Sequence, residues 1–128
     1  MASTPAELKQ RTKEFAIRIV RMVDVLPRST AAQVIARQVL RSGTSVAANY
    51  RAACRARSRA EFVAKLGIVE EEADETLSWL ELIVAASLLP VERLQGLLDE
   101  AHQLTAIFVA SRKTARGDNR QSAIGNRK

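Results

Sequence analysis

The sequence has few of the residues on which secreted proteins and metal enzymes depend. Its 128 residues include one cysteine and one histidine, so no disulfide can form within the chain and a usual zinc site lacks a second Cys or His ligand. No apolar run reaches the ~18–20 residues that cross a bilayer. The N-terminus also lacks the apolar core of a signal peptide. We therefore expect a cytoplasmic protein without membrane contact.

Catalytic groups are equally sparse. There is no glycine-rich loop of the kind that cradles phosphate. The acids between Glu70 and Glu75 lack the Glu-x-x-His motifs that accompany di-iron sites in helical bundles. Cys54 and His102 stand far apart in the sequence, and Cys54, among alanines, is expected to be a small buried side chain. We expect no enzymatic activity, no metal and no cofactor.

What is abundant favours helices. Apolar residues make up 47% of the chain, aromatic residues only 4%, and five glycines and three prolines leave little room for long loops. Thr4–Glu7 and Ser58–Glu61 are capping boxes, and apolar residues recur every three or four positions after each. The chain is predicted to be all-α: an antiparallel up-down-up-down four-helix bundle over residues 1–112, then a disordered, flexible basic tail over residues 113–128.

Two central helices carry the more informative patterns. The second begins near Ser29 or Thr30, and Gly43 interrupts an apolar face that includes Val34; one continuous helix is favoured over two shorter helices joined at Gly43. The third helix is apolar on two sides, as expected of a helix with two neighbours. Its second face is predicted to meet another helix or another subunit at an oligomer interface, and it includes Glu72, Trp79 and Ile83.

Charge is sorted along the chain, whose net charge is +6. No acid lies between Asp24 and Glu61, whereas seven arginines do. On a continuous helix at about 100° per residue, five of these arginines share an arc of about 80°. Arginines spaced a turn or more apart can follow a phosphate backbone. The predicted nucleic-acid-binding residues are Arg37, Arg41, Arg51, Arg55 and Arg59.

The same arginines have a second interpretation. The stretch between Lys65 and Arg93 contains acids and no base, so the arginines can pair with Glu70, Glu71 or Glu75 within or between subunits. The chain would then be a scaffold or protein-interaction ring. A basic tail is a weaker indication of nucleic-acid binding; it comprises Arg112, Lys113, Arg116, Arg120, Arg127 and Lys128.

Two motifs go beyond composition. Residues 42–49 read S-x-T-S-V-x-A-N, and residues 72–80 read E-x-D-E-T-x-x-W-L. Over residues 10–112 the chain resembles the bacterial four-helix-bundle proteins encoded in intervening sequences of 23S rRNA genes, also labelled S23 ribosomal proteins. Ala52 stands where many relatives carry an acid, and Arg55 and Arg57 replace residues that are often acidic, so this segment is unusually basic.

The resemblance implies a left-handed bundle that assembles into a ring-shaped homopentamer without enzymatic activity. It implies a nucleic-acid role, from the location of the family's genes and from a similar accessory protein of diversity-generating retroelements, which works with a reverse transcriptase and RNA. In this setting Asn49 is expected to be a buried amide that bonds the backbone across helices. Ser42, Thr44 and Ser45 are expected at a close helix crossing.

Overall fold

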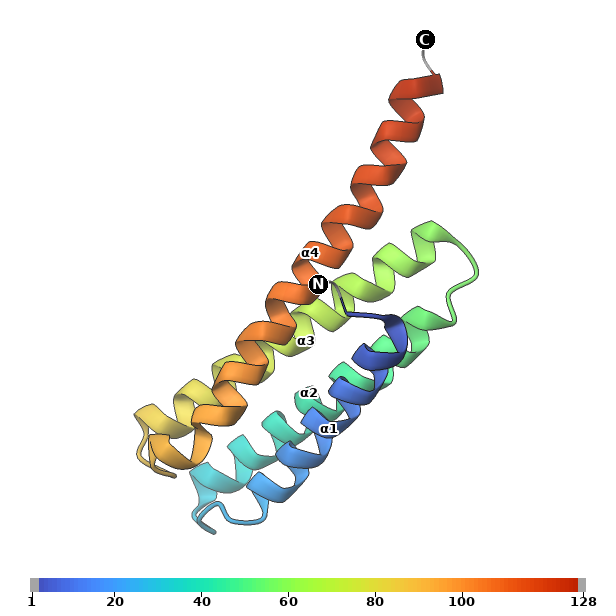
Figure 1. Ribbon diagram of the computed structural model, residues 1–128. Coiled ribbons are helices and arrows are strands. Elements are labelled where there is room, and N and C mark those ends of the chain that lie inside the picture. The colour runs from blue at the N-terminus through green and yellow to red at the C-terminus, as the bar shows by residue number, and fades with distance from the viewer. Residues whose placement is uncertain (1–2, 127–128) are drawn as a thin grey trace.

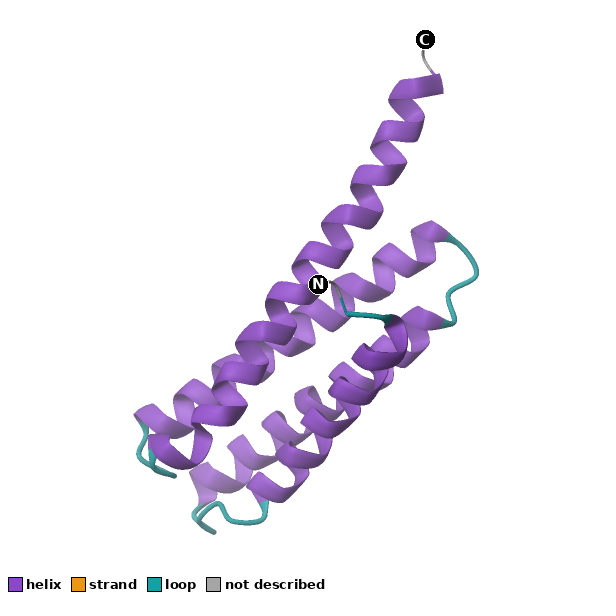
Figure 2. Cartoon of the chain, viewed as in Figure 1, coloured by secondary structure: helices purple, strands orange, loops and turns teal. Residues whose placement is uncertain are grey.

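The computed structural model describes residues 3–126, with side chains as far as Gly117, and shows an all-α chain of four helices (Figure 1). Each helix runs antiparallel to the one before it, and short loops join them (Figure 2). The predicted fold class is confirmed. The helices are α1 (Pro5–Val23), α2 (Thr30–Cys54), α3 (Arg59–Ala85) and α4 (Val91–Asn126).

Hydroxyl caps fix the beginnings of the first three helices. The Thr4 hydroxyl accepts a hydrogen bond from the Glu7 amide at 3.1 Å, and the Ser58 hydroxyl accepts one from the Glu61 amide at 3.1 Å. The Ser29 hydroxyl caps α2 in the same way. Each cap satisfies an amide that has no partner inside its helix. The expected helix starts are therefore confirmed.

Helix α2 continues without a break through Gly43, as predicted. A Cβ at this position would lie 2.9 Å from Cγ1 of Ile19 in α1, closer than side chains pack. The missing side chain therefore lets the two helices approach. Gly43 marks a close crossing and not a turn.

The core runs along the inner faces of all four helices and includes Phe15, Leu66, Leu80 and Phe108. The prediction that Val34 belongs to the apolar face of α2 is wrong. Val34 is 50% exposed, because it lies on the outer face of α2 with the arginines.

The four helices do not pack equally. The contact of α2 with α3 is the most extensive and that of α1 with α4 the sparsest. Helix α4 projects beyond the other three (Figure 1). The predicted boundary at residue 112 has no counterpart in the backbone, since α4 continues through it to Asn126; Arg127 and Lys128 lie outside the described residues.

Candidate functional site

The predicted arginine stripe lies mostly on the outer face of α2. Arg37, Arg51 and Arg55 are exposed, and no carboxylate among the described side chains forms an ion pair with them. Arg37 and Arg51 are 14 residues apart, which is about four helical turns. Their guanidinium groups are therefore available to an anion from solvent.

Arg41 differs from its neighbours because it forms ion pairs with two glutamates of α3. Its Nη1 lies 3.1 Å from Oε2 of Glu72, and its Nη2 pairs with Glu75. The hydrogen bond to Glu75 raises the pKa of Arg41. The indole N–H of Trp79, 3.0 Å away, and then Arg41 lower the pKa of Glu75. Pairing with α3 acids, the second interpretation of the stripe, thus occurs inside one chain for this arginine.

Arg59 does not continue the stripe along α2. That helix ends at Cys54, Arg55 is its C-cap, and Arg59 opens α3 after a short loop. The assumption of a single rod reaching residue 59 is wrong, because the Ser58 cap starts a new helix there. Arg59 belongs to the end of the bundle and not to the α2 row.

The three predicted interface residues have different surroundings. Ile83 has no exposed surface and packs in the core, so its predicted contact with a second subunit is wrong and its contact with another helix is right. Glu72 is half-buried and engaged by Arg41. Trp79 is half-buried at the edge of the core.

The S-x-T-S-V-x-A-N segment lies in the middle of α2. The Ser42 hydroxyl is buried and lies 2.8 Å from the Thr76 hydroxyl of α3, so Ser42 does sit at a helix crossing. The expectation that Asn49 bonds the backbone of another helix is wrong. Its amide donates to the Ser45 carbonyl at 2.9 Å and to the Ser45 hydroxyl at 2.7 Å, within its own helix and not across helices.

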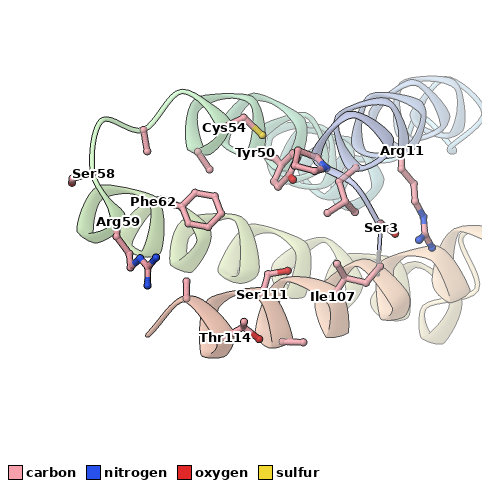
Figure 3. Close-up of a pocket in the computed structure, with 16 residues that line it drawn as sticks. Ser3, Arg11, Tyr50, Cys54, Ser58, Arg59, Phe62, Ile107, Ser111 and Thr114 are labelled. Carbon is pink, nitrogen blue, oxygen red and sulfur yellow. The ribbon is translucent and has the colours of Figure 1, made fainter. Parts of the chain in front are cut away.

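A large hollow that sequence reasoning missed opens at the end of the bundle where α1 begins and α2 ends. It measures about 1070 Å³, and its wall includes Tyr50, Cys54, Phe62 and Ile107, with polar groups at the rim (Figure 3). Cys54 is half-buried here and not fully buried as expected. Burial, and then the nearby Cys54, raise the pKa of Tyr50. No sequence signal marks this hollow, because four separate segments form it.

Among residues 3–117, no three His, Cys, Asp or Glu side chains gather closely enough to hold a metal ion. His102 is exposed. Nor is any helix in the described part of the chain both long and apolar enough to span a membrane.

Comparisons with known proteins identify the family. A solved structure of a protein of unknown function from the S23 ribosomal protein family of Bacteroides thetaiotaomicron is 36% identical, with a TM-score of 0.77; the match covers 83% of this chain and 98% of that one. A search of curated proteins gave no match. The sequence model of the 23S rRNA-intervening sequence proteins matches residues 5–110. The chain belongs to the 23S rRNA-intervening sequence protein family.

Proposed function

We propose that this protein is a non-enzymatic, homo-oligomeric RNA-binding module of the cytoplasm that holds RNA phosphates on the outer face of α2. The carrying observation is the composition of that face: exposed arginines, and no acid from residue 25 to residue 60. The name of the family connects its members with 23S rRNA, and RNA is the polyanion that this charge fits.

The structure narrows the set of arginines proposed to contact RNA. Arg37, Arg51 and Arg55 can each meet a phosphate at little cost, because they have no carboxylate to leave. Arg41 would have to exchange two carboxylates for one phosphate. Arg41 therefore contributes less affinity than the other three.

The test is a salt titration of RNA binding, measured by the fluorescence anisotropy of a labelled single-stranded RNA. The variant Arg51→Ala with Arg55→Ala removes two charges spaced by four residues, and Lys9→Ala with Lys13→Ala removes two exposed charges at the same spacing on α1. Loss of two phosphate contacts reduces the slope of log K against log salt by about 1.4. We expect that change only in the arginine variant. No RNA binding at low salt, or equal losses in both variants, would overturn the proposal.

A second candidate function is a scaffold ring that assembles a protein partner such as a reverse transcriptase. The in-chain pairing of Arg41 with Glu72 and Glu75 favours it, because α3 acids are able to attract α2 arginines. In a scaffold the exposed arginines would pair with α3 acids of a neighbouring subunit. The Arg51 and Arg55 variant would then lose its oligomer, whereas an RNA-binding role leaves the assembly intact.

A further inference from the structure

A second, smaller hollow lies between α1 and α4, at the opposite end of α1 from the large one. It measures about 360 Å³. Three arginines and four apolar residues line it, and the lining contains no acid: Arg18, Arg21, Met22, Val25, Leu89, Arg93 and Leu97. No α2 residue contributes to this hollow, which we call the α1–α4 groove.

Gly96 leaves room for one of these arginines. A Cβ at position 96 would lie 2.8 Å from Nη2 of Arg18, so the guanidinium of α1 rests directly against the backbone of α4. Glycine inside a helix is less stable than alanine, and position 96 is exposed, so core packing does not require it. The space left by the missing side chain is occupied by Arg18.

The arginines of the groove differ from others in the protein because they form no ion pair with the described carboxylates. Arg11, Arg41 and Arg112 each form an ion pair with a glutamate. By contrast, no carboxylate of residues 3–117 pairs with any of the three groove arginines. Three exposed cations that border one hollow give it a positive potential, which attracts an anion.

We propose that the α1–α4 groove binds a phosphate monoester whose organic part lies on the apolar floor. A carboxylate has two oxygens and is satisfied by one guanidinium fork, whereas a phosphate monoester offers three oxygens and up to two charges to several forks. Val25, which is 46% exposed, gives an aromatic or aliphatic group a surface to cover above the buried Met22 and Leu97. The source of the monoester is a small phosphorylated molecule or the 5′-phosphate of an RNA.

The test uses phenyl phosphate at low salt, followed by isothermal titration calorimetry, with benzoate as the carboxylate comparison. Gly96→Ala retains every charge but displaces the Arg18 guanidinium, and we expect affinity to fall about fivefold or more. Gly67→Ala is the matched control, because its Cβ would make only an ordinary contact with Arg112, 3.7 Å away. Arg18→Ala with Arg93→Ala should weaken binding by more than about tenfold.

The outcomes separate this proposal from the RNA-binding role of α2. The Arg51 and Arg55 variant should bind phenyl phosphate like the wild type. A trinucleotide with a 5′-phosphate that binds more tightly than its 5′-hydroxyl form, with the difference lost in Gly96→Ala, identifies RNA ends as the source; binding of phenyl phosphate without that difference identifies a small molecule. No saturable binding, equal binding of benzoate, or an unaffected Gly96→Ala variant would overturn the proposal.

Discussion

At the residue scale, the glycines differ in whether the structure has room for a Cβ atom. A Cβ added at Gly43 would lie 2.9 Å from Cγ1 and 3.2 Å from Cβ of Ile19, so the obstacle is the branched base of a buried side chain. A Cβ added at Gly67 would meet one side chain, at ordinary contact distance. Replacing each glycine by alanine therefore tests whether packing or helix propensity decides stability at that site.

Gly43→Ala is expected to destabilise the protein by about 1–3 kcal/mol, because overpacking exceeds the gain in helix propensity. Gly67→Ala, the control, is expected to stabilise it by up to about 1 kcal/mol. Urea unfolding followed by circular dichroism measures both. A Gly43→Ala variant as stable as Gly67→Ala would mean that α1 and α2 separate at little cost.

Glu75 makes stability depend on pH. Trp79 and Arg41 lower its pKa below the usual 4.5, so Glu75 contributes stability above that pH and loses it as the pH falls through its lower folded value. Glu75→Gln should therefore lose less stability than the wild type between pH 7 and acid conditions, in urea midpoints measured across this range. Glu71→Gln, on an exposed position of α3, should follow the wild type. Parallel curves for all three proteins would contradict this role.

At the scale of the element, the end of α3 rests on one strained residue. Ser87 has φ of 58°, in the left-handed region, and the amide of Leu88 donates to the Ile83 carbonyl to close the helix. Residues with a Cβ are disfavoured there, and glycine is the usual choice.

Ser87→Gly should therefore stabilise the protein by about 0.5–1 kcal/mol. The same substitution at Ser78, an exposed position inside α3, should destabilise it by about 0.5 kcal/mol through lower helix propensity. Thermal unfolding of both variants measures the two signs. Destabilisation by Ser87→Gly would show that the serine side chain has a role in this turn.

The helices could be predicted because their signals are local. Caps at Thr4, Ser29 and Ser58 lie next to the backbone groups that they satisfy, and apolar spacing depends only on helical geometry. The sequence named Glu75 among the possible partners of the arginines, but not Glu72, and which arginine meets them depends on the register between α2 and α3. The groove around Arg18 was beyond sequence reasoning, because it requires the placement of α1 against α4.

At the scale of the whole molecule, α3 leaves an uncovered stripe whose apolar ends flank Glu72 and Glu75, the two carboxylates that pair with Arg41. Ile68 is 39% and Leu82 is 43% exposed, and the half-buried Trp79 lies between them at helical spacing. The sequence identified this face through Trp79, although Ile83 beside it turns inward to the core. Under the proposed oligomer, this stripe is where a second copy packs.

Ile68→Glu with Leu82→Glu should reduce the assembly to a monomer of 14.1 kDa. In the interface, each new carboxylate would be buried against apolar side chains of the second copy, which costs free energy. Light scattering coupled to size exclusion measures the mass. Ile17→Glu with Val20→Glu places the same charges on exposed apolar positions of α1 and should leave the mass unchanged. An unaltered mass in the α3 variant would remove this stripe from the interface.

The sparse packing between α1 and α4 leaves the bundle with a seam, a weakly packed boundary between the first and the last helix of the chain. Both hollows open onto this seam, one at each end of α1. A molecule bound in either hollow would contact both helices and hold them together. Amide protons of α1 are then expected to exchange with deuterium faster in the protein without ligand than in the protein with ligand bound.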